Sequence, residues 1–196
     1  MVETRRQQID SVAGALFRER GYAATSVRDI AQRSGIQGAS LYAHVASKED
    51  VLWSIVQGAA RRFHDAASAV SEHTDLTAAD RLRRMIQAHV AVVTDDLGQA
   101  SVFLHEWRHL SDSRRAAVLA ARDTYERRFR QVIEDGQRSG GFATVEAGLV
   151  TRAILDALNG ICGWYRPDGR SSPTQIADHY AELFIHALKS TPEDPP

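Results

Sequence analysis

The chain of 196 residues contains a single cysteine, Cys162, so no disulfide can form within it. It also lacks any run of about 18 apolar residues, which a helix needs to cross a bilayer. Its first residues are polar rather than those of an apolar secretory segment. We therefore expect a cytoplasmic protein with no membrane contact. Hydrophobic residues make up 43% of the chain, which is enough for a folded core.

Signals for β-strands are nearly absent, because the chain has no alternating β-branched run and no hairpin dipeptide between such runs. Apolar residues instead recur at helical spacing, which predicts an all-α protein of about nine helices. Capping boxes predict where three of them begin, at Ser47, Thr77 and Ser172. Besides a short helical pair at 25–43, the expected helices cover about 4–20, 48–70, 78–94, 95–109, 113–138, 144–165 and 173–188.

Most sequence motifs of catalysis are also missing, including the nucleophile elbow, the phosphate-binding loop and the dinucleotide fingerprint. One exception is His105-Glu106-Trp107-Arg108-His109, an H-E-x-x-H motif. On a regular helix its two histidines share a face and could hold zinc, with Glu106 as general base. A catalytic zinc needs a third protein ligand, and no motif supplies one at the usual spacing. We therefore expect no enzyme, metal or cofactor, and keep a zinc hydrolase as the alternative.

The strongest pattern in the sequence is a helix-turn-helix between Thr25 and Lys48. A hydroxyl cap at Thr25 or Ser26 opens a helix that buries every third or fourth residue, and Ser34-Gly35 ends it. The second helix carries small side chains around Gly38 and Ser40, so its surface is slim enough to enter the major groove of DNA.

This stretch resembles the DNA-binding domain of the TetR family of bacterial transcription regulators. The resemblance lies in Thr25 to Ala31, in Gly35 to Tyr42 and in Ser47-Lys48-Glu49, whereas Ala43 and Val45 depart from the usual pattern. It implies a three-helix DNA-binding domain over residues 1–47, followed by a helical bundle for effector binding and dimerisation over 48–190. It also implies a repressor that binds double-stranded DNA.

The charge distribution supports a DNA-binding first domain. Residues 1–48 hold seven Lys and Arg against four Asp and Glu, a net +3, although the whole chain carries −1. Thr25 and Arg28 suit phosphate contacts, and Gln37, Gly38 and Ser40 could contact base edges. The resemblance adds Tyr42, for which a buried core tyrosine is the alternative. His44 and Lys48 complete the set, because a cation in the first turn of a helix is unfavourable unless a phosphate lies nearby.

The helix expected at 144–165 is apolar around much of its circumference, so it needs cover on several sides. A second copy of the chain can supply part of this cover, with help from the helix at 173–188. A homodimer also suits a palindromic operator, whose half-sites lie about 34 Å apart. A deeply buried helix in a monomer is the alternative.

Polar residues on otherwise apolar helix faces predict a small-molecule site in the second domain. His89 and Arg122 are of this kind, although a satisfied core histidine or an arginine with a buried stem would look alike. With four neighbouring candidates they outline an effector site: Phe103, Trp107, Tyr125 and Asn159.

A second resemblance concerns the effector. Residues 122–142, Ala153-Ile154-Leu155, Asn159 and Trp164-Tyr165-Arg166-Pro167 are similar to TetR-type repressors of fatty-acid, phenylacetate and sterol breakdown. Those proteins respond to acyl-coenzyme A thioesters, so the resemblance implies an acyl-CoA effector. A TetR-type repressor that senses multiple drugs or cations is the alternative.

Overall fold

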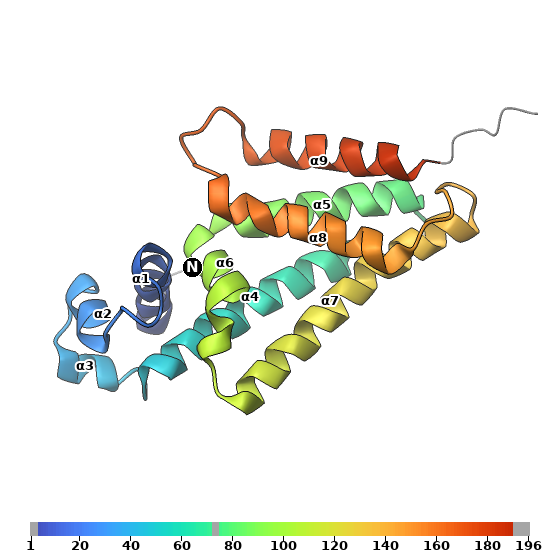
Figure 1. Cartoon of the computed structure of the whole chain (residues 1–196). Coiled ribbons are helices and arrows are strands. Elements are labelled where there is room, and N and C mark those ends of the chain that lie inside the picture. Colours follow the sequence, from blue (N-terminus) through green and yellow to red (C-terminus); the bar gives the residue numbers. More distant parts are fainter. Residues whose placement is uncertain (1–3, 72–74, 190–196) are drawn as a thin grey trace, which may run out of the picture. The chain divides into compact units, whose positions relative to one another are not determined.

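The structure is a computed structural model and describes residues 4–71 and 75–189. In this part of the chain all regular secondary structure is helical and there is no strand, which confirms the all-α prediction and its nine α-helices (Figure 1). None of the described helices is long and apolar enough to cross a membrane. The elements are α1 (Arg5–Arg20), α2 (Val27–Arg33), α3 (Gly38–Tyr42), α4 (Lys48–Ser71), α5 (Ala78–Asp95), α6 (Leu97–Ser101), η1 (Val102–Glu106), η2 (Trp107–His109), α7 (Asp112–Arg138), α8 (Ala147–Trp164) and α9 (Pro173–Leu188).

The predicted caps explain where several helices begin. The backbone N–H of Asp50 donates to Ser47 Oγ over 3.0 Å, and that of Asp80 donates to Thr77 Oγ1 over 3.1 Å. Ser172 forms the capping box of α9. The helix-turn-helix opens at Ser26, the second of the two expected caps, whose hydroxyl accepts from the backbone of α2. Because these hydrogen bonds join residues three apart, the sequence alone could predict them.

Two compact units make up the chain. The first takes Met1–Arg62 and Asp96–Ala121, and the second takes Phe63–Asp95 and Arg122–Pro196. Segments far apart in sequence therefore share a unit, and both α4 and α7 continue from one unit into the other. Ser190, the end of the expected second domain, lies outside the described residues.

In the first unit, α1 packs closely against α6. The contact is made at two glycines: a Cβ added to Gly98 would lie 3.1 Å from the carbonyl carbon of Gly14. Side chains of α1, α2 and α3 fill the core beside this contact, and the largest fully buried ones are Ile9, Leu16, Phe17, Ile30 and Leu41. This core holds the two short helices of the helix-turn-helix in place.

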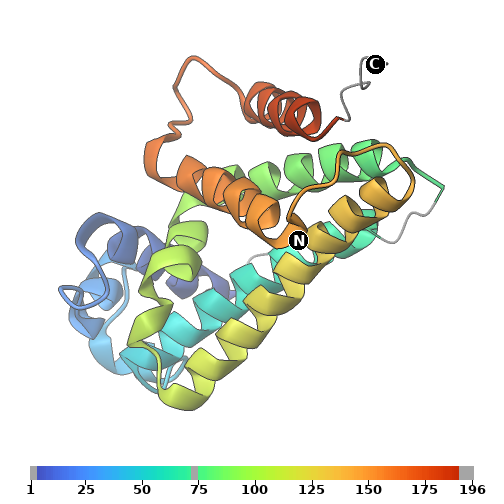
Figure 2. The ribbon, with the colours of Figure 1, turned by 45° about the vertical axis from the view of Figure 1, so that its right-hand side comes forward.

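In the second unit, α5 packs against both α8 and α9, and α9 runs alongside α5 in both views (Figures 1 and 2). The turn after α7 depends on Gly140, whose φ of 74° is open to glycine. Buried apolar residues come from five helices of this unit, and they include Phe63, Met85, Phe129, Ile154 and Ile185.

The single helix expected over 95–109 is wrong. The structure divides it into α6, the π-helix η1 and the short 3₁₀-helix η2. Val102, Phe103 and Leu104 are all buried. Consecutive residues of a regular α-helix point about 100° apart, so three in a row cannot share one buried face. The wider turn of the π-helix brings them inside together.

Candidate functional site

The predicted helix-turn-helix is formed by α2, a tight turn and α3. α2 ends at Arg33 with Ser34 as its C-cap, and Gly35 follows with a φ of 65°, a conformation that glycine adopts without strain. The backbone N–H of Ile36 donates to the carbonyl of Ala31 over 3.1 Å and closes the turn. Leu41 is fully buried, so the inner face of α3 is anchored in the core while its other faces remain free.

Six of the eight predicted DNA-binding residues are exposed on this unit. Tyr42 leaves 59% of its surface accessible, so it is not the buried core tyrosine of the alternative interpretation. The other five lie on α2, on α3 or just beside it: Arg28, Gln37, Gly38, Ser40 and His44. Their exposure makes them available to a ligand as large as a duplex, and their contact with DNA stays a prediction.

Thr25 and Lys48 are placed differently from the other six. The Thr25 side chain is buried, and its hydroxyl donates to the carbonyl of Gly21 over 2.9 Å. Lys48 Nζ donates to the carbonyls of Tyr22 and Thr25 over 2.9 and 2.8 Å. In this structure both side chains therefore stabilise the loop between α1 and α2. Sequence reasoning missed this role because the partners are backbone carbonyls, which no residue pattern reveals.

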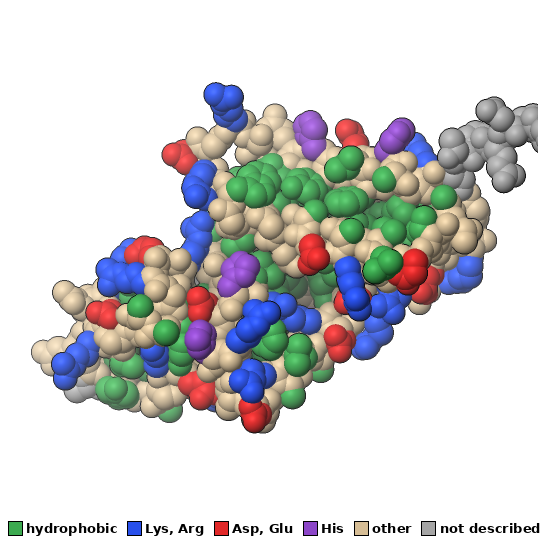
Figure 3. All heavy atoms as spheres, viewed as in Figure 1, with side chains coloured by type: hydrophobic (Ala, Val, Ile, Leu, Met, Phe, Trp, Pro, Cys, Tyr) green, Lys and Arg blue, Asp and Glu red, His purple; other side chains and the backbone are tan. Residues whose placement is uncertain are grey.

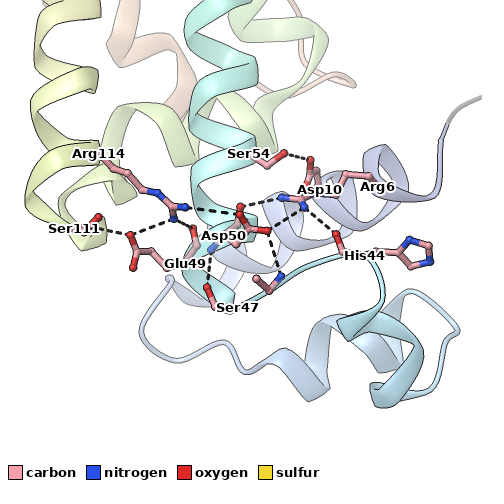
Figure 4. Close-up of polar contacts among 10 residues, drawn as sticks. Arg6, Asp10, His44, Ser47, Glu49, Asp50, Ser54, Ser111 and Arg114 are labelled. Carbon is pink, nitrogen blue, oxygen red and sulfur yellow. Dashed lines mark hydrogen bonds and ion pairs between the residues drawn. The ribbon is translucent and has the colours of Figure 1, made fainter.

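A network of ion pairs that the sequence did not predict surrounds the first turn of α4 (Figure 4). Arg6 of α1 donates to the carbonyl of His44 and to the side chain and carbonyl of Asp50. Arg114 of α7 contacts Glu49 and Asp50 from another element. The partners are separated by 38 to 65 positions in the chain, so no local motif could have indicated them.

Two carboxyl groups of this network, those of Asp10 and Glu49, have pKa values shifted in opposite directions. Burial raises the pKa of the Asp10 carboxyl, although Ser54 donates to it over 2.6 Å and Arg6 pairs with it. The backbone N–H of Ser111 donates to Glu49 over 3.1 Å and lowers the pKa of that carboxyl. Glu49 is thus held ionised, as an ion pair requires.

The H-E-x-x-H segment has a packing role in the first unit. Its residues lie in η1 and η2 rather than on a regular α-helix, so the i, i+4 geometry of a zinc site does not apply. Glu106 accepts a hydrogen bond from the backbone N–H of Tyr22 over 3.3 Å, and the His109 ring stacks on the Tyr22 ring at 5.0 Å. Among the described residues, no group of three or more His, Cys, Asp or Glu is arranged to hold a metal ion.

His89 and Tyr125, two of the predicted effector residues, meet inside the second unit. His89 Nδ1 lies 3.0 Å from the Tyr125 hydroxyl, and the ring of Phe63 lies 4.9 Å from that of His89. Burial lowers the pKa of His89 to about 3 and raises the pKa of Tyr125, so both side chains are neutral at pH 7. His89 Nε2 is buried without a hydrogen-bond partner among the described residues.

The other effector candidates are distributed over both units. Arg122 and Asn159 are half-buried residues of the second unit, on α7 and α8. Phe103 and Trp107 are buried in the first unit. His89 and Tyr125 are thus two predicted effector residues in direct contact with each other.

Large apolar side chains are exposed on the last two helices. Leu149 and Trp164 of α8 and Leu183 of α9 leave 64%, 49% and 62% of their surfaces accessible. Figure 3 shows hydrophobic side chains gathered over these two helices. An exposed apolar surface of this kind is typical of a contact with another protein chain.

Comparison with known proteins covers both parts of the chain. Residues 9–55 match the family described as bacterial regulatory proteins, tetR family, and residues 75–188 match the tetracyclin repressor-like C-terminal domain. The HTH-type transcriptional repressor KstR2 of Mycobacterium tuberculosis (strain ATCC 25618 / H37Rv) is 28% identical over 193 residues, which is 95% of this chain and 94% of that protein.

Solved structures give the same result. The TetR family regulator PfmR from Thermus thermophilus is 34% identical, with a TM-score of 0.85 over 93% of this chain and 99% of that one. AibR, in complex with isovaleryl coenzyme A and operator DNA, is 25% identical, with a TM-score of 0.82 over 92% and 97%. KstR2 and PfmR are transcriptional regulators rather than enzymes. The chain therefore belongs to the TetR family of DNA-binding transcriptional regulators.

Proposed function

We propose that this protein represses transcription as a homodimer on a palindromic operator and is released from DNA by an acyl-CoA thioester. DNA binding is proposed from the exposed outer face of α2 and α3. The accessible residues on this face are Arg28, Gln37, Ser40 and Tyr42. Arg28 would contact a phosphate, and the residues of α3 would contact base edges in the major groove. Thr25 and Lys48 would act mainly by holding the α1–α2 loop.

The homodimer is proposed from the exposed apolar residues of α8 and α9. Burying Leu149, Trp164 and Leu183 against a second copy would remove much apolar surface from water, at about 25 cal/mol for each Å². Two copies related by a two-fold axis would present two copies of α3, the proposed recognition helix, to the two halves of a palindrome. We also propose a cytoplasmic location, where the protein would reach DNA.

The effector is proposed from the cluster around His89 and Tyr125 and from the relatives. AibR has been crystallised with isovaleryl coenzyme A, and the ketosteroid transcriptional regulator KstR2 shares the fold of this chain with a TM-score of 0.91. The neutral pair His89 and Tyr125, packed among aromatic rings, suits an uncharged acyl group better than a cation. The unpaired His89 Nε2 could bond a carbonyl oxygen of the ligand, which would relieve the cost of a buried unpaired nitrogen.

Arg122 and Arg166 are the arginines that we propose would meet the phosphates of coenzyme A. Arg122 begins the part of α7 that belongs to the second unit, and Arg166 lies exposed just after α8. Asn159 of α8 would complete the polar part of this site. Phe103 and Trp107 remain candidates from the sequence.

A release experiment tests the proposal. The full-length protein is bound to a labelled fragment of the DNA upstream of its own gene, and fluorescence anisotropy follows release by isovaleryl-CoA and octanoyl-CoA. Free isovalerate and octanoate, and a planar cationic dye, serve as controls. We expect release by the thioesters alone. Release by the dye alone would replace this proposal with a sensor of cationic compounds.

A further inference from the structure

The first turn of α4 lies between two arginines that come from different helices (Figure 4). Arg6 reaches it from α1, and Arg114 reaches it from the beginning of α7. Asp50 faces both guanidinium groups: its Oδ2 lies 3.1 Å from Arg6 Nη1, and its Oδ1 lies 3.8 Å from Arg114 Nη2. A single carboxylate thus connects the two helices.

Arg6 connects this carboxylate to His44, two residues after the end of the recognition helix α3. Its Nη1 donates to the carbonyl of His44 over 3.0 Å, and its Nη2 donates to the carbonyl of Asp50 over 2.9 Å. Figure 4 shows the His44 ring pointing away from the cluster, so only its backbone takes part. α3 has five residues, and its N-cap Gln37 makes no side-chain hydrogen bond to it.

Arg114 holds the same turn from the other side. Its Nη1 donates to the carbonyl and to Oε1 of Glu49 over 3.3 and 3.2 Å. Glu49 Oε1 also accepts the backbone N–H of Ser111, the residue just before α7. The beginning of α7 is therefore joined to the beginning of α4 by both a side chain and the backbone.

The same helix α7 carries proposed effector residues in the second unit. α7 runs without interruption from Asp112 to Arg138, with Arg114 in the first unit and Tyr125 in the second. The two residues are eleven positions apart, about 16 Å along a helix. A continuous helix moves largely as one body, so a shift at Tyr125 would also displace Arg114.

We infer that Arg114 is a positioning residue that holds the recognition helix through Glu49, Asp50 and Arg6, and that it passes movements of α7 on to that helix. The second half of this inference rests on the proposed effector. The side chains of these ion pairs are about one third accessible to solvent, and solvent-accessible ion pairs contribute little to global stability. The role of Arg114 should therefore be visible in DNA binding and in local backbone protection rather than in the melting temperature.

The test compares Arg114→Gln with Arg115→Gln in the full-length protein. Arg115 is a suitable control because it is the next residue of α7 and pairs with Asp112 and the Arg108 carbonyl, away from the first turn of α4. Without ligand, we expect Arg114→Gln to raise the operator Kd about three- to ten-fold. Hydrogen exchange of the peptide covering 37–46 should become faster as well. Arg115→Gln should change neither quantity, and Arg114→Lys should restore part of the affinity.

Coupling is measured as the ratio of operator Kd values with and without octanoyl-CoA. We expect Arg114→Gln to lower this ratio about five-fold relative to the wild type. An unchanged ratio would overturn the coupling half of the inference. Identical exchange and affinity in the two glutamine variants would overturn the positioning half.

The outcome also separates this inference from the proposed effector. If thioesters fail to release the wild-type protein, the effector proposal is wrong, whereas the ligand-free affinity and exchange still decide the role of Arg114. A double-mutant cycle with Glu49→Gln adds a check: the effect of Arg114→Gln should become smaller when Glu49 is already neutral, and the remainder should come from the Arg114 contacts with Asp50 and the Glu49 carbonyl.

Discussion

The ammonium group of Lys48 lies 4.3 Å from the centre of the Tyr22 ring and donates a hydrogen bond to the carbonyl of the same residue. A lysine in the first turn of a helix is unfavourable by itself, because the positive end of the helix dipole repels it. In this structure two carbonyls and an aromatic face offset that repulsion. The lysine therefore fixes the loop that leads into α2, and this changes what its removal should do to DNA binding.

Lys48→Met should weaken operator binding about five- to ten-fold, because the α1–α2 loop loses hydrogen bonds to a charged group, which contribute about 1.5–3 kcal/mol each. The salt dependence of binding should stay almost unchanged. The Lys48 ammonium group donates to two backbone carbonyls in this arrangement, so it does not neutralise a DNA phosphate and releases no counterion from it. Arg28→Ala is the comparison: it should reduce the salt slope by about 1. Anisotropy titrations from about 50 to 300 mM salt would measure both slopes. A slope reduced by about 1 in Lys48→Met would instead make Lys48 a phosphate contact.

Tyr42→Ala should cost about 1–3 kcal/mol of operator binding while leaving the melting temperature nearly unchanged. The ring is 59% exposed, so little core packing is lost on truncation. Tyr42→Phe should retain the apolar part of the contact and lose only what the hydroxyl contributes. Affinity for the operator and for unrelated DNA, measured beside a thermal melt, checks this. Full operator affinity in the alanine variant would remove Tyr42 from the DNA surface.

His89 should make the protein less stable in mild acid. Its pKa is about 3 in the folded chain and 6.5 when exposed, so between these values the unfolded chain binds the extra proton. Stability is therefore complete above pH 6.5 and falls as the pH drops towards 3. At about pH 5 the loss from this group is about 2 kcal/mol.

The measurement is urea unfolding of the wild type, His89→Phe and the surface control His179→Phe between about pH 5 and 8. His89→Phe should lose about 2 kcal/mol less than the wild type over this range. His179→Phe should follow the wild-type curve, because His179 is exposed on α9. Parallel curves for all three proteins would contradict a neutral buried His89.

The parts of the fold that could be predicted from the sequence are those set by neighbours in the chain. The caps at Ser26, Ser47 and Thr77 act over three residues, and the helices begin where these residues stand. The break at 95–109 could not be predicted, because it reflects which side chains the rest of the first unit buries. The contacts of Arg6 and Arg114 could not be predicted from the sequence either, because each of them joins separate helices.

The candidate site shows the same division. Exposure of Tyr42 and contact between His89 and Tyr125 agree with helical periodicity, which places residues on faces. Periodicity does not show what a side chain meets when it leaves the helix. Lys48 and Glu106 illustrate this, because their partners belong to the α1–α2 loop.

Gly98→Ala should destabilise the first unit by about 1–2 kcal/mol through overpacking. The added Cβ would lie 3.1 and 3.2 Å from backbone atoms of Gly14 and Ala15, and backbone atoms cannot change rotamer to make room as a side chain can. Gly58→Ala is the matched control. Its Cβ would meet a side-chain atom of Gln99 at 3.9 Å, so better helix propensity should stabilise the protein by about 0.5–1 kcal/mol. Chemical denaturation measures both changes, and equal stabilities would argue against a close approach of α1 and α6.

Leu183→Glu should convert the proposed dimer into a folded monomer. Leu183 is 62% exposed on α9 in the single chain, so the substitution should change the stability of the protomer little. In a two-fold interface the substitution would bury two glutamates close together, and their charges would repel each other after losing contact with water. Leu119→Glu, at an exposed leucine on the first-unit part of α7, is the control and should stay dimeric. Sedimentation velocity gives the mass of each variant, and circular dichroism checks that the helices persist. Because one protomer can occupy only half of a palindrome, the monomer should also lose most of its operator affinity while still binding a single half-site weakly. A Leu183→Glu protein that sediments as the wild type does would show that the exposed face of α8 and α9 is not where two copies meet.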